Sequence, residues 1–446
     1  MLATSVSQRL STSGIAGAIL GGVLLLVFAA GADTRAAQAA VTPVASASCG
    51  PVQYEGAGQA QALIVSDLPL QGDSRQRSLQ MNDAIRLVLK SRSWQAGARS
   101  VAFQACDDSN PSTGVWSKAI CQANAAAYAA DPSALGVVGT YNSGCAEAMI
   151  PLLGNAPGGG LAMVSPGNTL ICLTQSSPTC ANGEPHSLYP RRRNYARVVP
   201  NDAYQGAGLA SFAKQKRIGR AYILYAAKDV TSSGQAQAFR GAARLLGVRI
   251  VGFRAWDPHA SGYRALMRKV ARTSPSGLLL AGLTEDNGAR LIKDKVAVLG
   301  PNGGKVKLLA YDGFAQQSTI DLAGSAAKGM FASVPGRVPQ KLGGAGKTLV
   351  ADLQSELGGA VELFAPYAGQ AASLLLEAIA RSGRRSGVIT AMRTTRVQNG
   401  ITGSFRILPS GDPSVGPITI SVARKRFVPV REIDPPGRLV TAARRG

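Results

Sequence analysis

Histidine is scarce in this chain, because only His186 and His259 occur in 446 residues. No pair of histidines is spaced for a metalloprotease helix, and no serine lies in a nucleophile elbow. No two cysteines are separated by two residues, so a cysteine zinc site lacks its usual spacing. Since no acid, base and nucleophile can be assembled, we expect a protein that is not an enzyme and that uses neither a metal nor a cofactor.

Acidic residues are also few, with 25 Asp and Glu against 48 Lys and Arg, which gives a formal net charge of +23. Such an excess raises nucleic acid or an anionic membrane surface as a partner. The basic residues are scattered, however, and their densest clusters, at residues 191–193, 384–385 and 444–445, are not interleaved with aromatics on which bases could stack. We therefore predict a solvated basic surface and no nucleic-acid partner.

Apolar residues, by contrast, are plentiful at 46%, while charged residues make up only 16% of the chain. This composition excludes a disordered polyelectrolyte and predicts a folded protein. Because 446 residues exceed the size at which one hydrophobic core stops growing, we expect two compact lobes.

An apolar, uncharged run spans residues 14–31, with Arg9 before it and a small-residue stretch at 36–40 behind it. This arrangement is typical of an export signal. The run is also at the short edge of what spans a bilayer, so an uncleaved N-terminal anchor is the alternative. Both outcomes place the rest of the chain outside the cytoplasm, secreted, periplasmic or anchored, with the membrane as a partner only through that segment.

Six cysteines would then face an oxidising compartment, where an even number indicates disulfides. A lipid anchor at Cys49 is a lesser alternative, because the preceding residues 46–48 lack the large aliphatic residue that a lipoprotein signal prefers. Pairing neighbours closes the shortest loops and leaves the remaining two cysteines to each other. The predicted bridges are Cys106–Cys121, Cys172–Cys180 and, by elimination, Cys49–Cys145.

Short apolar runs typical of buried strands recur along the chain, with helical patterns between most of them. This alternation predicts an α/β fold with mostly parallel sheets covered on both faces. The expected strands are at residues 62–65, 100–103, 135–138, 161–164, 221–224, 249–253, 277–280 and 307–310.

The alternation lapses twice, in a loop at residues 175–197 and again at 329–347, and strand-like pieces return near the end. Crossings at these two lapses and near residue 400 would make a hinge of three segments. The predicted order is an export signal or anchor at 1–40, a linker at 41–58, a first lobe at 59–197 and 329–402, a second lobe at 198–328 and 403–433, and a basic tail at 434–446.

Polar turns follow two neighbouring strands of the expected first lobe. Ser143 and Gly144 open a helix after one strand, and Gly167, Asn168 and Thr169 follow the next. Ligands of open α/β sheets lie outside the carboxyl ends of the strands, and a helix N-terminus suits a carboxylate, so these turns form a candidate half-site. The alternative for Ser143 is that it only caps its own helix.

Asp312 follows the strand expected at residues 307–310 in the second lobe. Its carboxylate could receive an ammonium group from a ligand. The alternative is an ordinary surface turn, which is common for an aspartate followed by a glycine.

Together these segments resemble the type I periplasmic substrate-binding proteins that serve ABC importers of branched-chain amino acids. The most specific pieces are residues 66–72, 142–144, 165–169 and 328–330. The resemblance implies two Rossmann-like lobes, joined by three hinge segments, that close on a small-molecule ligand.

The resemblance also implies roles for individual residues. Family members hold the ligand carboxylate through a serine, a backbone group and a threonine, which match Ser143, Gly167 and Thr169, and hold the ammonium through an acidic residue, which matches Asp312. Aromatic residues usually wall the pocket from the second lobe. The positions that correspond to the pocket walls and to the loop after the first strand are Thr231, Leu283, Thr284, Leu70 and Gln71.

We therefore expect an extracytoplasmic solute-binding protein that captures an amino acid or a related small polar molecule for the permease of an ABC importer. The alternative is a membrane-anchored ligand sensor of the same fold, which a retained N-terminal segment would favour.

Overall fold

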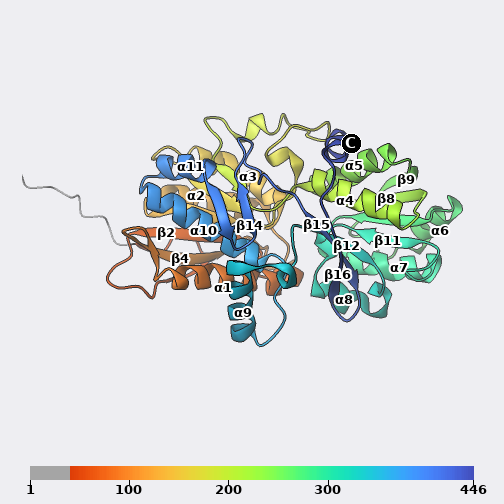
Figure 1. Cartoon of the computed structure of the whole chain (residues 1–446), viewed down its shortest axis with the longest axis horizontal. Coiled ribbons are helices and arrows are strands. Elements are labelled where there is room, and N and C mark those ends of the chain that lie inside the picture. The colour runs from red at the N-terminus through yellow and green to blue at the C-terminus, as the bar shows by residue number, and fades with distance from the viewer. Residues whose placement is uncertain (1–40) are drawn as a thin grey trace, which may run out of the picture. The chain divides into compact units, whose positions relative to one another are not determined.

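The computed structural model describes residues 41–446, and the predicted export signal lies outside them (Figure 1). Two seven-stranded sheets, each covered by helices on both faces, form the body of this region, and a two-stranded hairpin accompanies them. The expected α/β fold is confirmed. Among residues 41–446, no helix is long and apolar enough to cross a membrane.

The first sheet has the strand order β1-β4-β2-β5-β6-β7, and its strands are parallel except β1 and the short β3, which pair antiparallel with β4. Its strands are β1 (Cys49–Gln53), β2 (Ala62–Leu68), β3 (Gln95–Ala96), β4 (Arg99–Asp107), β5 (Ala134–Gly139), β6 (Ala162–Ser165) and β7 (Tyr195–Arg197).

Helices from distant parts of the chain cover the two faces of this sheet. Helices α2 (Lys118–Ala130) and α3 (Ser143–Gly154) pack on one face, and α1 (Arg75–Ser91) and α10 (Ala365–Arg381) on the other. Figure 1 shows α10 and α11 (Arg385–Arg393), coloured blue, returning to the red and orange strands. Helix α9 (Gly344–Leu357) packs against α1. We call this unit the first lobe.

The second sheet has the order β16-β15-β12-β11-β10-β8-β9, with β15 and β16 antiparallel at one edge. Leu278, Leu279 and Leu280 are all buried, as expected for a parallel strand covered on both faces. The strands are β8 (Arg220–Ala226), β9 (Arg249–Trp256), β10 (Gly277–Ala281), β11 (Lys307–Ala310), β12 (Phe331–Pro335), β15 (Ile418–Ala423) and β16 (Phe427–Ile433).

Six helices accompany the second sheet, and we call this unit the second lobe. Helices α4, α5 and α12 pack together on one face, and α6, α7 and α8 lie with the apolar cluster of the other face. Their bounds are α4 (Asp202–Gln215), α5 (Val230–Leu245), α6 (Arg264–Arg272), α7 (Ala289–Leu299), α8 (Gln317–Ala323) and α12 (Gly437–Arg445).

Each expected strand corresponds to an observed one, but four segments differ from the prediction. Strand β12 lies in the second sheet, so the chain leaves that sheet after Pro335, later than the predicted boundary at residue 329. Strand β14 (Gly403–Arg406) pairs only with β13 (Arg396–Gly400) in a hairpin. The chain therefore returns to the second sheet after Arg406, later than the predicted boundary at residue 403. Strand β12 has only five residues and is followed by Gly336, so no sequence pattern marked it.

The predicted linker and tail are also structured. Residues 41–58 include β1, which pairs with β4. Residues 434–446 include α12, whose Leu439 and Ala443 are buried against α4 and α5. These segments lack the longer apolar runs that indicated the other elements.

The three disulfides correct two of the predicted pairings. Cys172–Cys180 is confirmed, but the predicted Cys106–Cys121 and Cys49–Cys145 pairings are wrong. Cys49 in β1 lies directly opposite Cys106 in β4, and helices α2 and α3 pack side by side, so spatial neighbours replace sequence neighbours. The bonds are Cys49–Cys106 and Cys121–Cys145. The Cys49 sulfur is therefore not free to carry a lipid.

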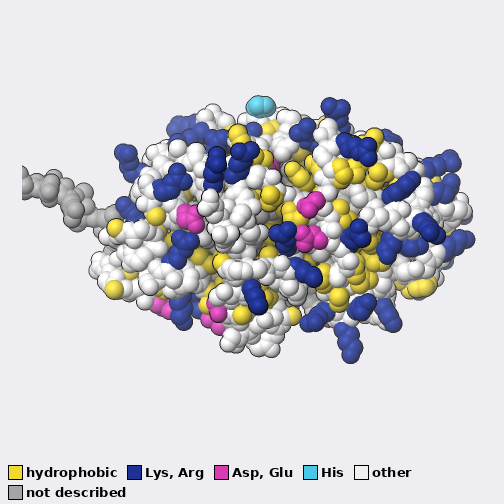
Figure 2. Space-filling view, in the orientation of Figure 1, with side chains coloured by type: hydrophobic (Ala, Val, Ile, Leu, Met, Phe, Trp, Pro, Cys, Tyr) yellow, Lys and Arg dark blue, Asp and Glu magenta, His cyan; other side chains and the backbone are white. Residues whose placement is uncertain are grey.

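Basic side chains are dispersed over the face that Figure 2 shows, in agreement with their scatter in the sequence. Figure 2 shows Lys and Arg spread across the visible face, with no single continuous basic patch on it.

Two buried carboxyl groups, Asp67 and Asp108, lie together beside the Cys121–Cys145 bridge. Asp67 accepts hydrogen bonds from the Tyr128 hydroxyl and from Asn124 Nδ2, whereas neither oxygen of Asp108 accepts one from the described residues. Burial raises the pKa of Asp67 to about 7. Burial and the neighbouring Asp67 raise the pKa of Asp108 well above its usual range. The folded pair therefore retains a proton that separate carboxyl groups would lose.

Because of this pair, we predict that the free energy of unfolding declines as the pH rises. An unfolded aspartate ionises near pH 4, whereas Asp67 in the folded chain stays protonated to about pH 7. The stability that this difference contributes is therefore full below about pH 4 and is lost as the pH rises through about 7. Asp108→Asn keeps a donor beside Asp67 but removes one titrating group. Urea unfolding at pH 4.5 and 7.5 should show a smaller loss of stability for this variant than for the parent chain.

The exposed Asp73 offers a matched control, and Asp73→Asn should show the same pH dependence as the parent. An unchanged pH dependence in Asp108→Asn would contradict the proton-sharing interpretation.

Candidate functional site

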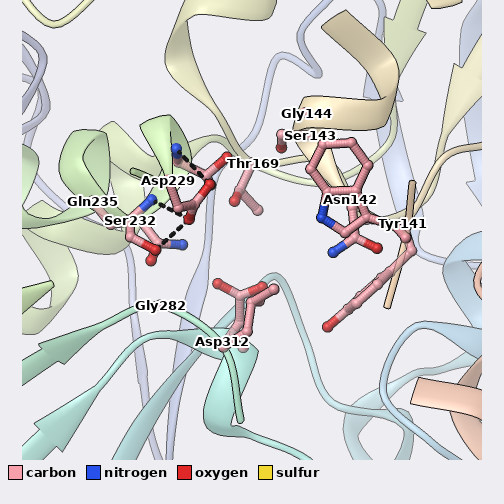
Figure 3. A pocket seen from close by; sticks show the side chains of 15 residues that line it. Tyr141, Asn142, Ser143, Gly144, Thr169, Asp229, Ser232, Gln235, Gly282 and Asp312 are labelled. Carbon is pink, nitrogen blue, oxygen red and sulfur yellow. Dashed lines mark hydrogen bonds between the residues drawn. The ribbon is translucent and has the colours of Figure 1, made fainter. Parts of the chain in front are cut away.

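A cavity lies where the carboxyl ends of strands from both lobes meet (Figure 3). It holds about 460 Å³ of empty space, including the part that opens to solvent. Its lining includes the start of α3 and the turn after β6 in the first lobe, and the turns after β8, β10 and β11 in the second.

Seven of the eleven predicted ligand-binding residues line this cavity. The polar turns converge because neighbouring parallel strands end at the same edge of a sheet. The seven are Ser143, Gly144, Gly167 and Thr169 from the first lobe, and Thr231, Leu283 and Asp312 from the second.

Two of the other four predicted residues lie just behind the lining. Asn168 Nδ2 donates to the carbonyl oxygen of Tyr141 at 2.9 Å, and the Thr284 hydroxyl donates to that of Gly313 at 3.1 Å. Tyr141 and Gly313 themselves line the cavity. Asn168 and Thr284 therefore hold the cavity wall in place.

The remaining two, Leu70 and Gln71, lie in the loop after β2 and outside the cavity lining. The Leu70 amide donates to Asp107 Oδ1 at 2.9 Å, and Gln71 Nε2 donates to Asp107 Oδ2 at 2.7 Å. These bonds fasten the loop to the end of β4.

The first-lobe side of the cavity offers hydrogen-bond donors. Helix α3 begins at Ser143, whose hydroxyl does not cap the helix; it accepts from the Leu170 amide at 3.3 Å instead. The helix-capping alternative is therefore wrong, and the hydroxyl proton remains available to a ligand. The first amides of α3 also have no partner within the helix. Figure 3 shows Ser143 and Thr169 facing Asp312 across the cavity.

The second-lobe side is dominated by Asp312, which is only 5% exposed. Its Oδ1 accepts from Gln205 Nε2 at 2.7 Å, and Gln205 Oε1 accepts from the Ser333 hydroxyl, also at 2.7 Å. No described Lys, Arg or His forms an ion pair with Asp312. Burial raises the pKa of Asp312, while the Gln205 hydrogen bond and the charge of Arg77 lower it. Asp312 is thus a desolvated acid without a counter-charge at contact distance.

Aromatic walls come from the first lobe, not from the second. Trp116 and Tyr141 line the cavity. The Trp116 indole packs so closely on Gly144 that a Cβ at position 144 would lie 2.6 Å from its Cη2 atom. Trp116 is in the loop between β4 and α2, far in sequence from any predicted strand end, so no sequence pattern marked it.

Asp229 is a second acidic residue of the lining that the sequence analysis missed. It follows β8 and precedes α5, the same strand-then-turn arrangement that marked Asp312, so the pattern could have found it. The negative charge of Asp229 affects two other acids. Burial, together with the charges of Glu184 and Asp229, raises the pKa of Glu147 to about 7. Burial and then the charge of Asp229 raise the pKa of Asp286 to about 7.

Direct contacts join the lobes beside the cavity. The Ser74 hydroxyl donates to Glu285, and Arg77 Nη2 donates to the carbonyl oxygen of Ala315 at 3.2 Å. Arg77, buried against the rings of Tyr141 and Phe364, also donates to the Tyr141 hydroxyl. The lining residue Tyr141 is therefore linked to an interlobe contact.

A buried ion pair joins two of the segments that run between the lobes. Arg197, at the end of β7, lies 2.9 Å from Asp412, which precedes β15. Arg197 also donates to the carbonyl oxygen of Asn168 at 2.8 Å. Its positive charge, with hydrogen bonds from Gln175, Ser410 and Thr174, holds the pKa of Asp412 below its usual range despite burial.

Comparison with known proteins finds one family model, described as periplasmic binding protein, that matches residues 112–420. No curated protein sequence matches the chain. Among solved structures, the leucine-binding protein LivK of Thermotoga maritima is 20% identical, with a TM-score of 0.72 over 84% of this chain and 99% of that one.

Two further structures have similar folds. LivJ of Streptococcus pneumoniae, in complex with isoleucine, is 13% identical with a TM-score of 0.68, over 83% of this chain and 99% of that one. A solute-binding protein of an ABC transporter from R. palustris, in complex with 4-hydroxybenzoate, is 14% identical with a TM-score of 0.70, over 84% and 98%. At these identities the likeness shows the fold.

The close contact of Gly144 with Trp116 predicts the effect of a single methyl group. In Gly144→Ala the new Cβ would displace the indole, an overpacking that costs about 1–3 kcal/mol. We expect altered tryptophan fluorescence and roughly tenfold weaker binding of the ligand that co-purifies with the protein, identified by native mass spectrometry.

Gly219→Ala, at a position with open space around it, is the control and should change neither property. Unaltered fluorescence and affinity in a folded Gly144→Ala protein would show that the indole does not rest on Gly144.

Proposed function

Because the chain belongs to the periplasmic binding protein family, we propose that it is an extracytoplasmic carrier that captures an amino acid in the interlobe cavity for the permease of an ABC importer. Binding proteins of this kind carry their ligands without chemical change and are not enzymes. The lobes close around the ligand and present it to the transporter.

One observation supports the choice of ligand. Uncharged hydrogen-bond donors line the first-lobe side of the cavity, and on the second-lobe side lies a buried acid, Asp312, that has no ion-pair partner among the described residues. The amides of α3 and the hydroxyls of Ser143 and Thr169 suit a carboxylate. Asp312 suits an ammonium group, which would supply the counter-charge that burial demands. An α-amino acid carries both groups on one carbon atom.

The alternative ligand class among the structural relatives is the aromatic acids, since one solved structure of the fold holds 4-hydroxybenzoate. Such a ligand has a carboxylate but no ammonium group. It would leave Asp312 buried without a counter-charge and would bring a second anion close to it. The cavity therefore favours the amino acid.

Asp312→Ala tests this assignment. It would leave the ligand ammonium desolvated and unpaired, which costs about 2–5 kcal/mol, or roughly thirtyfold to several thousandfold in affinity. Ser143→Ala should cost less, about 1–2 kcal/mol, because the amides of α3 still hold the carboxylate. Calorimetry with the co-purifying ligand, once identified, measures both effects.

Asp321→Ala, on the exposed face of α8, is the matched control and should bind like the parent. If a folded Asp312→Ala protein binds as tightly as the parent, the amino-acid assignment fails. Uptake of the labelled ligand by cells with and without this gene separates a transport role from the sensor alternative, since only a carrier is needed for uptake.

A further inference from the structure

The cavity contains one more carboxylate than a simple amino acid requires. Asp229 and Asp312 both line it, and no Lys, Arg or His among residues 41–446 is in the lining. A bound zwitterion would place its ammonium at Asp312 and its carboxylate at α3, which leaves the charge of Asp229 without a partner on the ligand.

Asp229 already has a structural task, because it caps helix α5. Its side chain accepts from the amides of Thr231 at 3.3 Å and Ser232 at 2.8 Å and from the Ser232 hydroxyl, and Figure 3 shows it beside Ser232. A carboxylate has about four lone-pair positions, so these bonds do not exhaust its capacity to accept. Capping alone does not require an acid, since asparagine caps helices equally well.

The surroundings of Asp229 are acidic. Its charge contributes to the raised pKa of Glu147, on α3 across the cleft, and of Asp286, after β10. Lys118, which lowers the pKa of Glu147, is the opposing cation, and it is not among the lining residues. This concentration of negative charge occurs in a chain with a net charge of +23, so it is a local property of the cleft.

The walls around Asp229 are polar as well. Thr231, Ser232 and Gln235 line the cavity from α5, and Leu283 is the only large aliphatic residue that the described part of the chain adds to the lining. A branched aliphatic side chain would therefore meet hydroxyls, an amide and a carboxylate. Trp116 adds an aromatic wall, and the faces of such rings attract cations.

We propose that the ligand is an α-amino acid whose side chain carries a second positive charge, an amine or a guanidinium, and that Asp229 receives this charge. The inference rests on the proposed function, because it takes the orientation of the amino acid between α3 and Asp312 as given. Asp312 and Asp229 then divide the two cations of the ligand, while α3 holds its carboxylate.

Two pairs of amino acids of closely matched size test the inference by calorimetry on the ligand-free protein. L-lysine and L-norleucine differ by the terminal amine, and L-arginine and L-citrulline differ by the charge of the terminal group. We expect the cationic member of at least one pair to bind at least tenfold more tightly than its neutral partner. Asp229→Asn should abolish that preference, because asparagine can still cap α5 through its amide oxygen but carries no charge.

Asp257→Asn is the matched control, since Asp257 accepts from the His259 amide in an exposed turn outside the cavity lining. It should keep the preference of the parent. Circular dichroism and the unfolding midpoint establish that each variant is folded.

The opposing outcomes separate the two proposals. If neutral amino acids bind as tightly as cationic ones, or if Asp229→Asn weakens both members of a pair equally, the inference is wrong and the proposed function stands. If no amino acid binds and the co-purifying ligand lacks an ammonium group, both proposals fail.

Discussion

The ion pair between Arg197 and Asp412 connects the segments between the lobes to the cavity. Both side chains are buried, so each charge depends on the other for compensation. Arg197 also donates to the carbonyl oxygen of Asn168, whose neighbours Gly167 and Thr169 line the cavity. Asp412 in turn accepts from Thr174 and Gln175 of the adjoining loop. A single electrostatic contact thus fixes two connecting segments and the turn that offers donors to a ligand.

Charge of one sign is concentrated in the cavity. Basic and acidic side chains both lie on the face that Figure 2 shows, whereas the charged residues in the cavity lining are the acids Asp229 and Asp312. Surface charges lie in water and interact weakly, but carboxylates in a partly closed cavity act through a lower effective dielectric constant. The net charge of +23 therefore has little influence on which ligand the chain prefers, whereas the two aspartates of the cavity have a direct influence.

The parts of this structure that the sequence predicted are those set by local pattern. The run of Leu278 to Leu280 indicated a buried strand because both of its faces are covered, and Ser143, Thr169 and Asp312 follow from the rule that sites lie at strand ends. The disulfide partners Cys49 and Cys106 depend on the register of β1 against β4, which no local pattern encodes.

Trp116 shows the same limit within the cavity. Its place is set by how its loop folds over α3, with the indole resting where Gly144 has no side chain. Asp229 differs, because it follows β8 and so obeys the rule that sites lie at strand ends. The strand predicted at residues 221–224 is therefore sufficient to indicate Asp229 as a candidate.

The isolation of Asp312 has a consequence for timing in a carrier of the proposed kind. An empty cavity that closed would confine this acid, with Gln205 as its hydrogen-bonding partner, in a space without solvent or counter-ion, and that confinement is unfavourable. A cationic ligand removes the penalty at the moment the lobes meet, so closure and loading are thermodynamically linked. The closed conformation, which a transporter would recognise, would then form mainly when ligand is bound. Carriers without ligand would remain open and would compete little for the permease.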